Sequence, residues 1–150
     1  MSEEPEILFS IDGRAGLVTL NRPKALNALT LEMFRALHGQ LREWEGDDRV
    51  ERIIIEVAGD RAFCAGGDIR RLYEWGLAMD PRFLDLFREE YLLNTYIKYY
   101  SKPYIALIDG IFMGGGVGVS VHGSHRIVSE RATFAMPETG IGLFPDVGST

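Results

Sequence analysis

Cysteine is almost absent from this sequence. Cys64 is the single cysteine among 150 residues, so no disulfide can form within the chain and a reducing compartment is expected. Positive charge is also scarce, because 16 lysines and arginines stand against 22 acidic residues and the formal net charge is −6. This balance argues against a nucleic-acid-binding surface and against attraction to anionic membranes. A phosphorylated ligand would therefore need local cations.

The sequence also lacks a recognisable targeting or membrane-spanning segment. The first residues, MSEEPEI, are acidic and have no apolar core of the kind that signal peptides carry. The one long apolar stretch, Tyr104 to Val121, contains Asp109 and five glycines, which favours a core strand and helix over a membrane span. We therefore expect a protein of the bacterial cytoplasm or, after processing, of the mitochondrial matrix.

The pattern of apolar residues predicts an α/β fold. Apolar and β-branched runs at Glu6–Ile11 and Gly16–Leu20 flank Asp12-Gly13, which is a hairpin signal. Thr30 is a candidate N-cap for a helix that runs to about Trp44. The helix's apolar face is predicted to comprise Leu31, Phe34, Leu37, Leu41 and Trp44. The other predicted elements are a strand over 50–58, a short helix ending near 75, a longer helix over 81–99 and a buried strand over 104–109.

A glycine run and two carboxylates point to chemistry near the end of the chain. Gly114–Gly116 follow the predicted strand, where the chain should turn and start a helix. The first N–H groups of a helix have no intrahelical partner, so they can stabilise an oxygen that gains negative charge. Glu138 and Asp146 follow among prolines and glycines, which indicates a shaped loop and not a helix face. Donors followed by carboxylates suggest an active site for acyl chemistry.

Other reactive side chains offer weaker alternatives. Cys64 could be a nucleophile with His122 or His125 as its base. A small buried apolar residue is the better-supported interpretation of this cysteine. The three histidines, His38 included, show no metal-ligand spacing with carboxylates, so no metal site is predicted.

Four blocks of sequence carry a family resemblance. They are NRPKALNAL at 21–29, AFCAGGDI at 62–69, the glycine run at 114–116 and MPETGIGLFPDVG at 136–148. In this order, over nearly the whole chain, they resemble the crotonase family, also called the enoyl-CoA hydratase/isomerase superfamily, and most of all its 3-hydroxyisobutyryl-CoA hydrolase branch. The resemblance implies a crotonase-like spiral of ββα repeats that holds an acyl-CoA. Residues 1–150 would form the N-terminal part of such a domain, without its C-terminal helices.

The same resemblance implies roles for individual residues. The N–H groups of Gly67 and Gly115 would form an oxyanion hole for the thioester carbonyl. Glu138 would attack the carbonyl or activate a water, and the sequence leaves both roles open. Asp146 would orient the water or the substrate's β-hydroxyl and keep Glu138 in its working protonation state, and Glu90 would contact the substrate. The implied lining of the acyl-CoA site is Lys24, Ala25, Leu26, Ala65, Asp68 and Ile69.

CoA enters this scheme only as part of the substrate. Arg22 and Lys24 are candidates for the cations that its phosphates require in an acidic protein, and for Arg22 a solvated basic residue in a loop is an equally favoured alternative. The resemblance implies no separate cofactor. The expected partners are the acyl-CoA, a second copy of the chain in a homo-oligomer, or the missing C-terminal part.

Two positions depart from the hydratase pattern. Enoyl-CoA hydratases carry a catalytic glutamate three residues after the middle glycine of the corner, where this chain has Gly118. They commonly have glycine where this chain has Asp146, whereas the hydrolases have aspartate. With these two departures, the resemblance implies hydrolysis of a short hydroxyacyl-CoA thioester. The alternatives are an enoyl-CoA hydratase or isomerase that works through an enolate, and a non-catalytic acyl-CoA-binding fragment.

The position of Asp146 near residue 150 leads to one more expectation. A carboxylate close to a frayed end is mobile and hydrated, so residues 1–150 alone should be poorly active. They should also expose apolar surface on the helix Met113–Val121.

Overall fold

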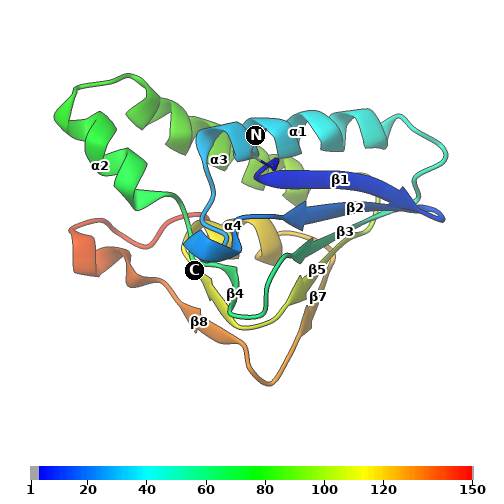
Figure 1. Cartoon of the computed structure of the whole chain (residues 1–150). Coiled ribbons are helices and arrows are strands. Elements are labelled where there is room, and N and C mark those ends of the chain that lie inside the picture. Colours follow the sequence, from blue (N-terminus) through cyan, green and yellow to red (C-terminus); the bar gives the residue numbers. More distant parts are fainter. Residues whose placement is uncertain (1–3, 150) are drawn as a thin grey trace.

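The computed structural model describes residues 4–149 and has a mixed α/β architecture with two sheets (Figure 1). The larger sheet has the strand order β1-β2-β3-β5-β7, and the smaller one has the order β4-β6-β8. The strands are β1 (Ile7–Asp12), β2 (Ala15–Leu20), β3 (Arg52–Val57), β4 (Ala62–Cys64), β5 (Tyr104–Ile108), β6 (Ile111–Met113), β7 (His125–Val128) and β8 (Thr133–Ala135). The helices are α1 (Leu31–Glu45), α2 (Ile69–Leu77), α3 (Arg82–Lys98) and α4 (Gly115–Val121), with 3₁₀ turns η1 (Pro23–Ala25) and η2 (Pro137–Ile141).

The larger sheet begins with the predicted hairpin. Asp12 pairs with Ala15 at its tip, and Gly13 takes a positive φ of 57° that suits a residue without a side chain. β1 and β2 are antiparallel, and β3, β5 and β7 continue the sheet in parallel from β2. The predicted hairpin and the strands at 50–58 and 104–109 are therefore confirmed, with slightly shorter bounds.

From β3 onward the strands come in consecutive pairs, with one strand of each pair in each sheet. β3 is followed by β4, β5 by β6 and β7 by β8, and each second strand joins the smaller sheet in parallel order. Helices follow the first two of these pairs, so the expected spiral of ββα repeats is confirmed. The short second strands place the turns after β4 and β6 beside each other. This juxtaposition positions the candidate site.

Helix α1 follows its predicted design. The Met33 backbone N–H donates to Thr30 Oγ1 at 3.2 Å, which is the side-chain cap expected of Thr30. All five predicted face residues are buried, and the helix ends before Gly46. α1 and α3 lie along one side of the larger sheet (Figure 1). Their apolar faces form the core with the sheet.

The expectation that Met113–Val121 exposes apolar surface is wrong. Val117 and Val119 of α4 are 1% and 0% exposed. α4 packs between α3 and the strands β4, β5 and β6, and the Tyr104 hydroxyl donates to the Val119 carbonyl at 2.9 Å. The exposed large apolar side chains of the C-terminal third are instead Ile127, Val128, Phe134, Ile141 and Phe144. Across residues 4–149, no helix combines the length and apolarity needed to cross a membrane.

Candidate active site

A cavity of about 300 Å³ lies where the turn after β4, the start of α4, helix α3 and the η2 segment meet. We call it the carboxylate cavity, because Glu90, Glu138 and Asp146 line it. The predicted residues Ala65, Gly67, Ile69 and Gly115 line it as well. Its remaining walls include the apolar side chains of Leu72, Leu86, Phe87, Ile141 and Leu143. An apolar pocket with a few convergent polar groups is typical of a small-molecule site.

Two backbone N–H groups meet at this cavity. Gly115 is the first residue of α4, and a Cβ built on it would lie 3.3 Å from the Gly67 nitrogen. Within residues 4–149, neither the Gly67 nor the Gly115 N–H donates to another protein group. Two adjacent free donors at an apolar cavity can stabilise a developing oxyanion.

The protein's own packing requires glycine at one of these two positions. A Cβ on Gly115 would come within 2.6 Å of Glu90 Oε1, so a side chain there would displace the carboxyl. A Cβ on Gly67 would meet only Leu86 Cδ2, at 3.9 Å, which is ordinary van der Waals contact. The space that a side chain at Gly67 would enter is therefore open cavity and is not filled by protein atoms.

Glu90 is a buried acid on α3. It is 4% exposed, and burial raises its pKa from 4.5 to about 8, with smaller contributions from the negative charges of Asp146 and Glu138. At neutral pH the carboxyl is therefore mostly protonated and can donate a hydrogen bond. An ionised carboxylate, by contrast, could only accept one.

The raised pKa of Glu90 predicts a stability effect of Glu90→Gln. Between pH 4.5 and 8 the unfolded chain loses this proton while the folded protein keeps it, so wild-type stability falls as pH rises through that window. One pKa unit corresponds to about 1.4 kcal/mol. We expect Glu90→Gln to match wild type near pH 5 and to be more stable by a few kcal/mol at pH 8. Equal stability differences at the two pH values, measured by denaturant unfolding, would contradict this assignment.

Glu138 presents a free carboxylate oxygen. It lies in η2, a turn that Pro137 begins and Gly142 ends with a positive φ of 77°. Glu138 is 8% exposed, and its Oε2 atom has no hydrogen-bond partner within the described part of the chain. A buried carboxylate oxygen without a partner is available to a water or a substrate atom.

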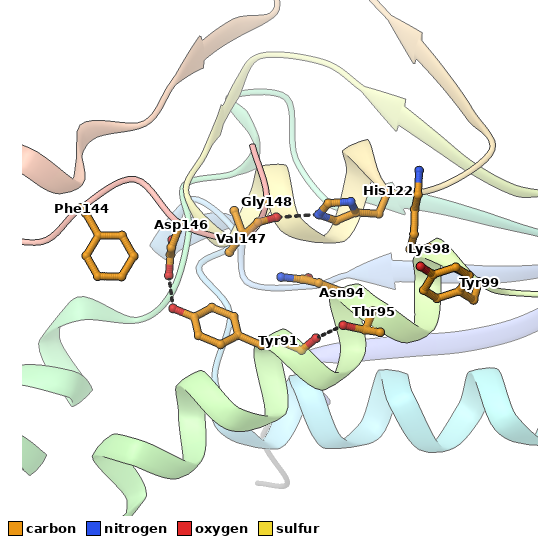
Figure 2. Close-up of a pocket in the computed structure, with 10 residues that line it drawn as sticks. All are labelled: Tyr91, Asn94, Thr95, Lys98, Tyr99, His122, Phe144, Asp146, Val147 and Gly148. Atoms are coloured by element: carbon orange, nitrogen blue, oxygen red, sulfur yellow. Dashed lines mark hydrogen bonds between the residues drawn. The ribbon is translucent and has the colours of Figure 1, made fainter. Parts of the chain in front are cut away.

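Asp146 lies between two cavities. It lines the carboxylate cavity and a second, more open one of about 610 Å³, which we call the outer cavity (Figure 2). The Tyr91 hydroxyl donates to Asp146 Oδ2 at 2.5 Å. His122 Nε2 lies 2.5 Å from the Val147 carbonyl oxygen, and since a carbonyl only accepts, this nitrogen carries the proton. The two contacts hold the turn in which Val147 has a positive φ of 51°.

Sequence reasoning missed these two supporting residues. Tyr91 was predicted only as part of a helix, and His122 only as a base for a cysteine. The contact of Tyr91 with Asp146 spans 55 residues, so no local pattern signals it. The usable signal is that Tyr91 directly follows Glu90 on the same helix.

Several predicted lining residues lie away from the carboxylate cavity. Lys24 and Ala25 border a separate surface cavity of about 360 Å³, and Leu26 is half-buried beside them with a positive φ of 52°. The Asp68 carboxylate accepts from the Arg71 backbone N–H at 3.3 Å and thereby caps α2. The Asp68 side chain thus stabilises the start of a helix, whereas the neighbouring Ile69 faces the cavity.

Arg22 is neither a free cation nor a solvated loop residue. Its guanidinium pairs with Glu6 and Asp68, at 3.0 Å in each case. It also donates to the Ala28 carbonyl at 2.6 Å, and its side chain is only 16% exposed. Arg22 is therefore part of the fold, and Lys24 is the exposed cation of this segment.

The cysteine-nucleophile alternative is excluded. Cys64 is fully buried, and burial raises the pKa of its thiol to about 12, so almost no thiolate exists at neutral pH. His122 contacts the Val147 carbonyl and His125 the Ser124 hydroxyl. Among the residues that the structure describes, no group of three or more His, Cys, Asp or Glu side chains is arranged to hold a metal ion.

Comparison with known proteins places this geometry in a family. Residues 15–150 match the model of the family described as enoyl-CoA hydratase/isomerase. The mitochondrial 3-hydroxyisobutyryl-CoA hydrolase of Danio rerio is 59% identical over 143 residues, which cover 95% of this chain and 37% of that protein. This chain thus spans little more than a third of that relative's length.

Solved structures share the fold. A carnitinyl-CoA dehydratase from Mycobacterium thermoresistibile is 45% identical with a TM-score of 0.95, over 97% of this chain and 43% of that one. An enoyl-CoA hydratase from Rhodobacter sphaeroides is 48% identical with a TM-score of 0.92, over 96% of this chain and 43% of that one. The family model covers well over half of the sequence, and the similarities agree with it. The chain therefore belongs to the enoyl-CoA hydratase/isomerase family.

Proposed function

We propose that the protein hydrolyses a short hydroxyacyl-CoA thioester of the 3-hydroxyisobutyryl-CoA type to the free acid and CoA. The name of the Danio rerio relative supports this substrate class. Hydrolysis is favoured over hydration because there is no room for a side chain at position 118. A Cβ at that position would lie 2.9 Å from both amide atoms of Asn94 and 3.0 Å from Val147 Cβ.

The closed position 118 removes the second glutamate of a hydratase. In the hydratases that this chain resembles, the position of Gly118 carries a catalytic glutamate. In this chain the Asn94 side chain fills the space that a side chain at position 118 would need. The carboxylate that joins Glu138 is instead Asp146, which lies in the loop after η2 and lines the same cavity. This set of groups supports attack on a thioester carbonyl better than addition of water across a double bond.

The proposed reaction uses the groups already described. The thioester oxygen would accept from the Gly67 and Gly115 N–H groups, which stabilise the negative charge that develops during attack. Glu138 would either take a proton from the attacking water or attack the carbonyl carbon itself to form a mixed anhydride. In both routes a C–O bond forms, the C–S bond breaks, and the CoA sulfur leaves and gains a proton. In the second route water then hydrolyses the anhydride, which releases the free acid and regenerates the Glu138 carboxylate. Asp146, held by Tyr91, would orient the water or the β-hydroxyl.

The rest of the site follows from the same proposal. Ala65 and Ile69 would contact the substrate beside the cavity, and Lys24 would meet the CoA phosphates. CoA would enter as part of the substrate, with no further cofactor and no nucleic acid or membrane partner. The chain would form the N-terminal part of a longer crotonase-like domain and act in a homo-oligomer. It would work in the bacterial cytoplasm or in the mitochondrial matrix; the relative's name includes the word mitochondrial.

A second candidate is hydration or isomerisation through an enolate. The names of the two similar solved structures, an enoyl-CoA hydratase and a carnitinyl-CoA dehydratase, favour it. Glu138 alone would then move a proton at the carbon next to the thioester, while the same N–H groups stabilise the enolate oxygen.

Release of free thiol separates the two candidates. We expect the full-length protein to release CoA from 3-hydroxyisobutyryl-CoA or 3-hydroxypropionyl-CoA, detected with a thiol reagent, and to leave crotonyl-CoA unhydrated. Hydration of crotonyl-CoA without thiol release from either hydroxyacyl-CoA would sink the proposal and favour the second candidate.

A further inference from the structure

Asn94 is a buried amide that no group of the described chain satisfies. It lies one turn after Glu90 on α3 and is 6% exposed. Neither its amide oxygen nor its amide nitrogen has a hydrogen-bond partner among residues 4–149. Figure 2 shows its carboxamide directed toward the segment that carries Asp146 and Val147. Buried amides nearly always have partners, so this one calls for a ligand atom or a water.

The side chain of Asn94 lies between a cavity and helix α4. Asn94 lines the outer cavity, which shares Asp146 with the carboxylate cavity. Its amide oxygen and nitrogen lie against Gly118, whose missing side chain gives the amide its room. A leucine at position 94 would fill the same space without any unpaired polar atom. The amide is therefore better explained by something that it binds than by packing.

The spacing of the two helices fits a hydroxyacyl group. Gly115 and Gly118 of α4 face Glu90 and Asn94 of α3, respectively. Three residues of α-helix rise about 4.5 Å. The amide therefore lies roughly 4–6 Å along the helices from the N–H group of Gly115. A hydroxyl on the third carbon of an acyl chain lies at a similar distance from the carbonyl oxygen.

We propose that Asn94 is a specificity-determining residue that binds the 3-hydroxyl of the acyl group, together with Asp146. The amide N–H donates to the hydroxyl oxygen, and the hydroxyl proton is accepted by the Asp146 carboxylate or the Asn94 amide oxygen. The inference rests on the proposed function and deepens it, since it explains why a hydroxylated acyl group would be preferred. Asn94 thus has two effects: it closes position 118 and it recognises the substrate.

The test compares two thioesters that differ only in this hydroxyl. The probes are 3-hydroxyisobutyryl-CoA and isobutyryl-CoA, and kcat/KM for CoA release is measured with the full-length protein. A site that hydrogen-bonds a substrate hydroxyl discriminates strongly against the analogue without it. We expect Asn94→Leu to lower kcat/KM for the hydroxylated thioester by about 10- to 200-fold and that for isobutyryl-CoA by about threefold or less. The preference for the hydroxyl should therefore collapse.

Two further variants keep the test decisive. Thr95→Val is the matched control, because Thr95 lines the same outer cavity but its hydroxyl donates to the Tyr91 carbonyl at 2.9 Å. It should leave the preference unchanged. Asn94→Ala removes the amide without added bulk and replaces Asn94→Leu if the latter does not fold. Wild-type release of CoA with an unchanged preference in the folded Asn94 variant overturns this inference alone, whereas no release by wild type from either thioester overturns the proposed function.

Discussion

Glu138→Gln should lower kcat for CoA release by about 10²- to 10⁴-fold and change KM by less than about threefold. The amide keeps the shape of the side chain, but it can neither take a proton from water nor attack a carbonyl. In the structure Glu138 Oε2 is buried without a partner, so the substitution breaks no hydrogen bond of the described chain. Steady-state kinetics with 3-hydroxyisobutyryl-CoA would measure the effect.

A matched control is available for this prediction. Glu130 is an exposed glutamate after β7, away from both cavities, and Glu130→Gln should keep wild-type kinetics. If Glu138→Gln kept kcat within about tenfold of wild type, Glu138 would be neither base nor nucleophile. The account would then lose its catalytic group.

Gly67→Ala is the second change with a large expected effect. A methyl group on the Gly67 Cα would occupy cavity space beside the N–H and hinder close approach of the thioester oxygen, so the change should cost about as much as losing one oxyanion donor, about 10²- to 10³-fold in kcat. The melting temperature should stay close to that of wild type, because the new Cβ meets only Leu86, at 3.9 Å. Loss of activity without loss of stability would indicate that the substrate occupies the cavity beside the Gly67 N–H.

Gly115→Ala provides the contrast to Gly67→Ala. Its Cβ would come within 2.6 Å of Glu90 Oε1, so this change should reduce both activity and stability. A Gly67→Ala protein with full kcat would show that the thioester oxygen does not lie at this N–H group.

Local sequence patterns predicted the elements whose caps, apolar faces and turn residues lie within the element itself. The α1 helix has a side-chain cap and an apolar face, and the first hairpin has Gly13 where a positive φ is needed. The strands β4, β6 and β8 were not predicted, since each has only three residues and depends on partners from the other repeats. Periodicity cannot show so short a strand.

Within the site, the family resemblance identified candidate residues that lie in the four resembling sequence blocks. Gly67, Gly115 and Glu138 line one cavity, as the order of the blocks implied. Asn94 was not anticipated, because helix periodicity does not reveal that it faces Gly118 on α4. Neither interpretation of Arg22 anticipated its ion pair with Asp68, because that partner is 46 residues away.

Oxygen-18 labelling tests the central claim most directly. The full-length protein would be incubated with 3-hydroxyisobutyryl-CoA in H₂¹⁸O, and the product would be analysed by mass spectrometry. Thioester hydrolysis places the label in the carboxylate of the released acid, with one free CoA thiol for each acid. Label found only at the third carbon of an intact acyl-CoA, without free thiol, would show hydration chemistry and contradict the proposed hydrolase.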